Sequence, residues 1–197
     1  VVVDLRDGAV NDIALNNITD IFAVEIVEVA DTKRPTAIQG HINYENGILK
    51  LTADESIDSN ATFAVFDRTK FFIRDVTGTG GFDLADTIIV GNQRPEIYFF
   101  LSELQRVEGI KISGTPGGDF GAAILDTLAL SFNDLSGNPS LEALNITMTE
   151  SADAKSPQIL TTDINFNNGT MVLTASETLR VANAYNGFKL INTTQMV

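Results

Sequence analysis

The sequence predicts an all-β fold built from tandem repeats, and three observations lead to this prediction. Residues 11–57 recur without a gap as residues 133–179, with 16 identities in 47 aligned positions. Chance does not produce an ungapped match of this length, so the pattern indicates an internal repeat. Short runs of alternating apolar and polar residues, separated by turn residues, are typical of strands. Only one short segment of the chain is a plausible helix.

The constant shift of 122 residues between the two copies defines the predicted domains. One complete domain covers residues 31–152. Residues 1–30 match the C-terminal part of a preceding domain, and residues 153–197 match the N-terminal part of a following domain. A unit of about 120 residues is long enough to bury its own core. We therefore expect the chain to be a window of a longer tandem array.

The first elements are two strands, expected over residues 1–5 and 22–29 because both segments are rich in Val, Ile and Phe. The polar segment 11–17 between them predicts a loop. Residues 31–35 predict a linker, because Pro35 cannot donate to a sheet ladder and marks the start or the edge of a strand.

The clearest pattern is a hairpin over residues 38–53. Apolar and polar residues alternate on both sides of Asn46 and Gly47. An Asn-Gly pair between two such runs predicts a β-hairpin in which both turn residues have positive φ. The second copy repeats the alternation around Asn168 and Gly169, which is the pattern of a half-buried sheet.

The remaining elements complete a sandwich. Further strands are expected over residues 70–75, 86–90, 96–101, 124–132 and 141–148, and over 188–192 in the second copy. Ser102 is a suitable N-cap for one short helix over residues 102–107. Seven or so strands with turns between them predict a sandwich of immunoglobulin (Ig) type. The likeness to antibody domains is architectural, because the chain has no Cys and no Trp.

Three motifs stand in a fixed order along the second copy. They are Asn-Asp-Leu-Ser-Gly-Asn-Pro at 133–139, Asp-x-Lys-x-Pro at 153–157 and Leu-Thr-Ala-Ser-Glu at 173–177. The first copy keeps this order, but Leu15 replaces Gly137 and Asn17 replaces Pro139. With these motifs the chain resembles the tandem bacterial-type Ig-like repeats of microbial, in particular archaeal, cell-surface and S-layer proteins.

The resemblance implies a structural protein of the cell surface, located outside the cell. Its tandem Ig-like domains would build an extracellular assembly by self-association, either an S-layer lattice or a filament. The alternative is an adhesin or a carbohydrate-binding surface module on the same scaffold.

The residues give no support for an enzyme. His41 is the only histidine and there is no cysteine, so a nucleophile paired with a histidine base is not indicated, and His41 is expected to be a solvated strand residue. The glycine-rich segments 78–81 and 114–118 lack the Gly-Lys-Ser/Thr ending of a phosphate-binding loop. They are expected to be turns. In the adjacent phenylalanines 71–72 and 99–100, both side chains of a pair cannot face the core.

Charge sets further limits on partners. The chain has 26 acidic and 13 basic residues, a formal net charge of −13. Such a surface repels nucleic acid and attracts cations. We expect no transmembrane segment in this window, because no apolar run of about 18 residues occurs. Along an array, the acidic excess predicts a cation-selective, acid-lined surface, although solubility alone is a sufficient reason for it.

Carboxylates that recur in register suggest calcium. The candidates are a loop Asp, a linker Asp and a strand-end Glu from each copy: Asp12, Asp31, Glu55, Asp134, Asp153 and Glu177. We expect them to converge at domain junctions, where Ca²⁺ would find the oxygen ligands that it prefers. The alternative is that the Asp residues serve turns and that the Glu residues are solvated strand ends.

Five Asn-x-Ser/Thr sequons are candidate glycosylation sites: Asn17, Asn60, Asn145, Asn168 and Asn192. A sequon permits N-glycosylation in an extracellular protein but does not require it. Asn168, in the predicted hairpin turn, is expected to be the most accessible.

Overall fold

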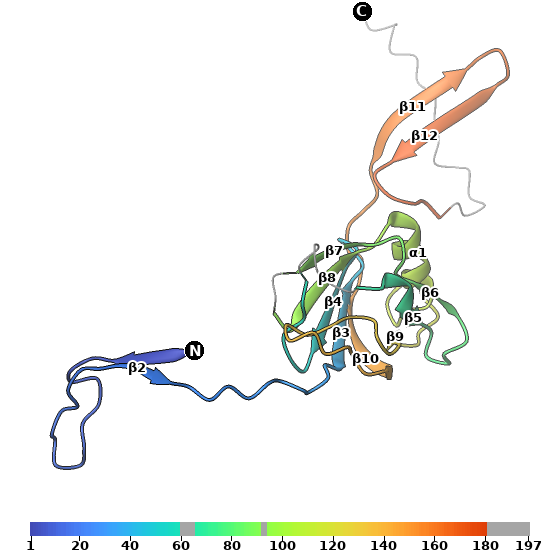
Figure 1. Cartoon of the computed structure of the whole chain (residues 1–197). Coiled ribbons are helices and arrows are strands. Elements are labelled where there is room, and N and C mark those ends of the chain that lie inside the picture. The colour runs from blue at the N-terminus through green and yellow to red at the C-terminus, as the bar shows by residue number, and fades with distance from the viewer. Residues whose placement is uncertain (60–65, 92–93, 181–197) are drawn as a thin grey trace, which may run out of the picture. The chain divides into compact units, whose positions relative to one another are not determined.

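The computed structural model describes residues 1–59, 66–91 and 94–180 (Figure 1). It divides the chain into two compact units, residues 1–34 and residues 35–197. The predicted strand over residues 188–192 lies outside the described residues. Strands predominate in the described part, so the all-β prediction is confirmed.

The first unit holds one antiparallel pair, β1 (Val2–Leu5) and β2 (Ile21–Glu25). The elements of the second unit are β3 (Ala37–Asn43), β4 (Ile48–Ala53), the 3₁₀-helix η1 (Arg68–Lys70), β5 (Phe71–Arg74), β6 (Gly81–Asp83), β7 (Ile88–Gly91), β8 (Glu96–Phe100), α1 (Glu103–Lys111), β9 (Ile124–Thr127), β10 (Ala143–Ser151), β11 (Ile159–Asn165) and β12 (Thr170–Ala175).

Eight strands of the second unit form one continuous sheet in the order β6-β5-β9-β10-β3-β4-β8-β7. Every neighbouring pair is antiparallel except β10 and β3, which run parallel. This parallel pair joins the two four-stranded halves of the sheet. Within the described residues, β11 and β12 pair only with each other (Figure 1).

The sheet curls so that its two halves share one core. Phe71 of β5 and Phe99 of β8 lie with ring centroids 5.2 Å apart, although four strands separate β5 from β8 in the sheet order. Both rings are fully buried, and their neighbours Phe72 and Phe100 face away from the core. The expectation that only one residue of each Phe pair faces inward is therefore confirmed.

The first hairpin of the second unit forms as predicted, but its turn is longer than an Asn-Gly pair requires. The strands are separated by residues 44–47, and Gly47 has φ of 67° whereas Asn46 is not in the left-handed region. The Asn43 side chain accepts hydrogen bonds from the backbone N–H groups of Glu45 (2.9 Å) and Asn46 (3.3 Å). These side-chain bonds stabilise a wider turn, so the prediction of positive φ at both residues was wrong.

Helix α1 begins where the sequence predicted, with a capping box. Ser102 accepts from the backbone N–H of Gln105, whose side chain accepts from the Ser102 N–H in return. The helix continues to Lys111, beyond the predicted end at residue 107. Its inner face is polar and packs Arg106 and Gly109 against the turn that follows β3.

One strand end and one short strand also differ from the prediction. Strand β9 ends at Thr127 instead of residue 132, and it cannot extend through the predicted span because Leu130 has φ of 62°, which an extended strand does not accommodate. The short strand β6 was not predicted, since Gly81 and a span of three residues give no alternation to detect.

Candidate functional site

The main polar cluster of the second unit surrounds the guanidinium of Arg106, on α1. This side chain donates to both carboxylate oxygens of Glu103 (2.8 and 2.9 Å) and to the carbonyl oxygen of Tyr44 (3.0 Å). It also donates to the carboxylates of Asp153 (2.6 Å) and Glu177 (3.4 Å). We call these five residues the Arg106 cluster. It joins α1 to the turn after β3, to the linker before β11 and to the end of β12.

Burial makes this cluster different from an ordinary surface ion pair. Arg106 is only 8% exposed, and the side chains of Asp153 and Glu177 are 16% and 14% exposed. A planar guanidinium can donate to several oxygens at fixed angles, which suits such a convergence. The backbone N–H of Thr178 adds a bond to Glu103 (2.8 Å), so the chain beyond β12 is fixed to α1 as well.

The charged groups of the cluster shift one another's pKa values. Hydrogen bonding to Arg106 lowers the pKa of Glu103 to about 2. For Asp153, burial raises the pKa, but the Lys155 backbone N–H and the bond from Arg106 outweigh it, so the pKa is lowered overall. The Glu103 contact, in turn, raises the pKa of Arg106. All three groups are therefore charged at neutral pH, and their role is electrostatic attachment.

Two residues of this cluster, Asp153 and Glu177, were predicted as calcium ligands, whereas Arg106 and Glu103 were not predicted to be functional. The available signal was the spacing of Glu103 and Arg106 on one helix, which allows an i,i+3 pair. Their distant partners could not be read from the sequence, because the contacts span 47 and 71 residues.

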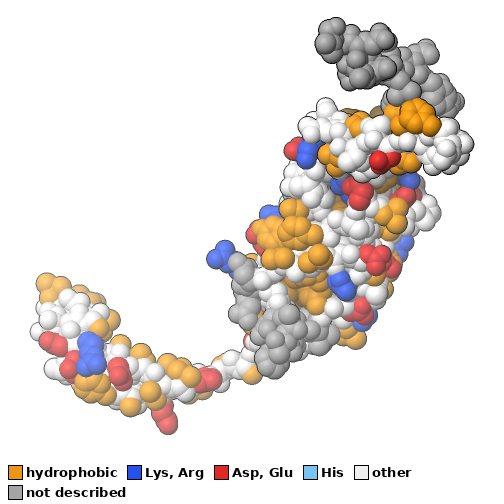
Figure 2. Space-filling view, turned by 90° about the horizontal axis from the view of Figure 1, so that it is seen from above, with side chains coloured by type: hydrophobic (Ala, Val, Ile, Leu, Met, Phe, Trp, Pro, Cys, Tyr) orange, Lys and Arg blue, Asp and Glu red, His pale blue; other side chains and the backbone are white. Residues whose placement is uncertain are grey.

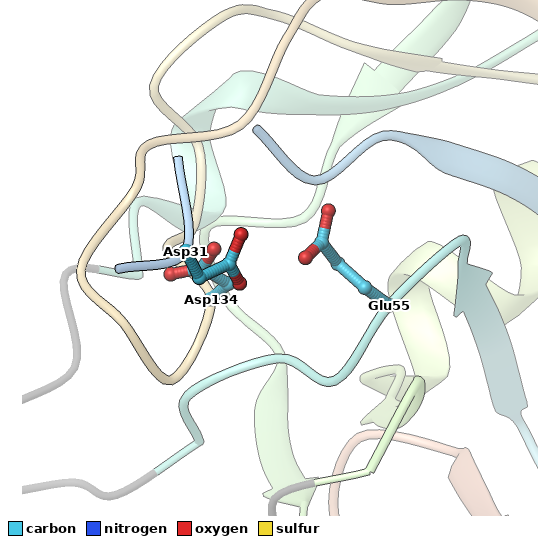
Figure 3. Close-up of side chains that lie close together, drawn as sticks. All are labelled: Asp31, Glu55 and Asp134. Atoms are coloured by element: carbon cyan, nitrogen blue, oxygen red, sulfur yellow. The ribbon is translucent and has the colours of Figure 1, made fainter. Parts of the chain in front are cut away.

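Another pair of carboxylates lies at the loop after β9. Glu55 follows β4, and Asp134 lies in the loop that precedes β10, with carboxylate oxygens within 4.8 Å of each other (Figure 3). Asp134 is buried and Glu55 is half-buried. An isolated bridge pairs Ile57 with Asp134 and brings the two segments together. Figure 3 also labels Asp31, which belongs to the first unit.

The Asp134 carboxylate is held by its own loop. It accepts hydrogen bonds from the backbone N–H groups of Ser136 (2.9 Å) and Asn138 (2.7 Å) and from the Asn138 amide (2.8 Å). Calcium binds oxygens at 2.3–2.6 Å, so one ion can contact two oxygens that are 4.8 Å apart. Glu55 and Asp134 can thus contribute two of the oxygens that a cation needs.

Two of the predicted carboxylates are part of the first unit. Asp12 and Asp31 belong to the first unit, where Asp12 accepts from the Asn16 backbone N–H (2.9 Å) and Asp31 from the Lys33 backbone N–H (3.0 Å). The prediction was that a loop Asp, a linker Asp and a strand-end Glu converge. Within the second unit the structure brings together a loop Asp, Asp134, and a strand-end Glu, Glu55.

Three of the five sequons lie in the described part of the chain, and Asn60 and Asn192 lie outside it. Asn17, Asn145 and Asn168 are exposed. The Asn168 side-chain oxygen accepts bonds from the backbone N–H (3.1 Å) and the hydroxyl (2.7 Å) of Thr170, the third residue of its sequon. This bond fixes the orientation of an asparagine that stands in a hairpin turn.

His41 lies on β3, half-buried, with its Nδ1 2.8 Å from the Thr149 hydroxyl on β10. It was expected to be a solvated strand residue; it is a partly exposed strand residue that also takes part in a cross-strand hydrogen bond. The contact joins the two parallel strands at the centre of the sheet.

Replacing Arg106 by Met should test how strongly the cluster stabilises the fold. Arg106→Met leaves the acidic groups of the cluster without their cation, so we expect a loss of roughly 3 kcal/mol in the free energy of unfolding, measured by urea denaturation. Lys111→Met is the control, because the Lys111–Glu108 pair is on the same helix but exposed, and should change stability by less than about 0.5 kcal/mol. If both substitutions changed the free energy of unfolding equally, the Arg106 cluster would stabilise the fold no more than an exposed ion pair does.

The lowered pKa values predict a pH dependence with a definite sign. Groups with a lower pKa in the folded state stabilise it fully above their unfolded pKa, which is about 4.3 for Glu. That stabilisation is lost as the pH falls from this value toward 2, the pKa of folded Glu103. Stability measured between pH 5 and pH 2 should fall more steeply for the unmodified chain than for Arg106→Met. If stability fell equally steeply with pH in both proteins, the Arg106 cluster would not contribute to the pH dependence of folding.

Calcium binding at Glu55 and Asp134 would stabilise the folded chain, because a ligand that binds only the folded state raises its stability. Added Ca²⁺ should raise the melting temperature, and Glu55→Gln should remove the shift. Glu108→Gln, on the exposed face of α1, should leave it intact. A melting temperature that does not respond to Ca²⁺ or to chelator would rule out the site.

Comparison with known proteins yields no match for this chain among protein-family models, curated proteins or solved structures. Among the described residues, no helix has the length and apolarity needed to cross a membrane.

Proposed function

We propose that this chain is a structural cell-surface protein whose tandem Ig-like domains build an extracellular lattice or filament. The observation that carries the proposal is the Arg106 cluster. It fixes the linker and the following hairpin to the preceding sheet through a buried arginine, a contact suited to holding one domain rigidly on the next. Function in such a protein depends on spacing and rigidity, and it needs no catalytic group.

Recurring local structure supports the tandem arrangement. Asp12 accepts from the backbone N–H and the side-chain amide of Asn16, both at 2.9 Å. Asp134 accepts the same two bonds from Asn138, at 2.7 and 2.8 Å. The two loops differ by the shift of 122 residues, so sequence and local geometry repeat together.

The strand pairs repeat in the same way. The Ala23 backbone N–H donates to the Asp4 side chain (2.8 Å), and the Asn145 backbone N–H donates to the Asp126 side chain (2.7 Å). Ala23 and Asn145 have nearly the same positive φ, 57° and 56°. Each pair therefore contains the same irregularity at the same place, which favours two domains of one type.

The acidic surface fits an assembly that takes up cations. On the face seen in Figure 2, Asp and Glu side chains are dispersed over the second unit, between apolar and basic ones. Dispersed charges produce a lasting potential only in confined gaps, because salt screens them within about 10 Å at 0.1 M. We propose that gaps between assembled domains enrich cations, and that Ca²⁺ at Glu55 and Asp134 takes part in this.

Immunogold labelling of intact cells that produce the protein tests the proposal. Antibodies against the chain should label the outer surface, over a regular lattice or along filaments in electron micrographs. Labelling inside the cell would contradict the proposed location. A surface label without any regular assembly, together with binding of the purified chain to a glycan array, would favour the adhesin or carbohydrate-binding alternative.

A further inference from the structure

The eight-stranded sheet has two edges, and described residues cover only one of them. At the edge formed by β6, helix α1 packs on the strand and the Gln105 side-chain amide donates to the Asp83 carbonyl oxygen (3.1 Å). At the other edge, no described strand except β8 pairs with β7 (Figure 1). All eight strands lie between residues 37 and 151, so this edge does not depend on parts of other repeats.

Strand β7 lacks the features by which edge strands usually avoid association. It contains no charged residue and no proline, either of which discourages pairing with another chain. Ile88 and Val90, on its outer face, are 69% and 53% exposed. Phe100 of β8 lies opposite Ile88 on the same face and is 39% exposed. An apolar strip therefore borders the open edge of the sheet.

The pairing of β8 shows which backbone groups of β7 point to the open edge. The Leu101 N–H donates to the Gly47 carbonyl oxygen (2.8 Å), so the odd-numbered residues of β8 direct their backbone groups at β4. Because the directions alternate along an antiparallel strand, the even-numbered residues of β8 face β7 and pair with its even-numbered residues. The backbone groups of Ile89 and Gly91 are thus directed outward.

We propose that β7 of one copy of this chain pairs antiparallel with β7 of a second copy, with the two Val90 residues on a two-fold axis. In this register Ile89 of each copy lies opposite Gly91 of the other, and each such pair exchanges two backbone hydrogen bonds. Strand addition to an exposed edge is a common mode of protein association. The contact rests on the proposed self-association and identifies a lateral surface for it.

Charges on both sides of β7 favour a second copy as the partner. Asp86 lies four residues before Val90 and Arg94 lies four residues after it, and both side chains are exposed. Two identical antiparallel strands place the start of one against the end of the other. An axis at Val90 therefore brings Asp86 of each copy toward Arg94 of the other, and cross-strand pairs of opposite charge stabilise a sheet.

A side chain at the start of β7 favours the same register. The Arg68 guanidinium donates to the Thr87 carbonyl oxygen, which is therefore not available to a second strand. A two-fold axis at Ile89 would place Thr87 opposite Gly91 and lose a backbone bond at each end. An axis at Val90 uses only Ile89 and Gly91. The resulting contact is the same on both copies, so it closes as a dimer.

Single cysteine variants report this register directly, because the chain has no cysteine of its own. Val90→Cys should form a disulfide-linked dimer under mild oxidation, since residues opposite each other in a pair without backbone bonds have Cα atoms about 4.5 Å apart. Ile88→Cys is the matched control on the same face of the same strand. Its two copies would lie about 13 Å apart along the strands and should cross-link poorly. Equal yields, or no dimer from either variant, would overturn the contact.

Analytical ultracentrifugation tests the charge pairs without any cross-link. The unmodified chain should show a monomer–dimer equilibrium in about 0.15 M salt, which screens the net charge of −13 beyond about 8 Å. Asp86→Arg and Arg94→Asp should each weaken the dimer about tenfold, because each converts two cross-strand attractions into repulsions. The double variant should restore the dimer, and Glu142→Arg, at an exposed site outside β7, should leave it unchanged.

A chain that stays monomeric at every concentration, or a double variant that does not recover, would overturn the β7 contact. Neither result would bear on the proposed location at the cell surface, which immunogold labelling tests separately.

Discussion

A buried guanidinium is retained in a protein only when oxygen atoms replace the water that it has lost, and Arg106 meets this condition with acceptors from four parts of the chain. Glu103 comes from the same helix, Tyr44 from a turn, Asp153 from the linker and Glu177 from the end of β12. None of these segments can move far without breaking a charged hydrogen bond in a poorly solvated place. The position of the β11–β12 hairpin relative to the sheet therefore depends on this side chain, together with the bond from the Thr178 backbone N–H to Glu103.

The sheet is a rigid base for the Arg106 cluster. Its two halves are joined by the parallel pair of β10 and β3 and closed by Phe71 against Phe99. Helix α1 is held at its start by the capping box of Ser102, so that Arg106 faces the linker. The rigid sheet and the charged contacts of the linker together restrict the orientation of the β11–β12 hairpin.

The sequence predicted the local elements well. The hairpins follow from alternation, and the start of α1 follows from Ser102, because these patterns depend on neighbouring residues. The order of strands in the sheet was not predictable, since the pairing of β10 with β3 joins residues more than 100 positions apart. The same limit applies to the site. Asp134 was recognised as a candidate from its recurrence, but its proximity to Glu55 depends on the tertiary fold.

If the Arg106 cluster makes the hairpin and the sheet one rigid body, nitrogen-15 NMR relaxation will show it directly. Backbone amides of β11 and β12 should report the same rotational correlation time as those of β3 and β4. Arg106→Met should shorten the value for the hairpin and leave that of the sheet unchanged. A shorter correlation time for the hairpin in the unmodified chain would show that the hairpin moves independently of the sheet.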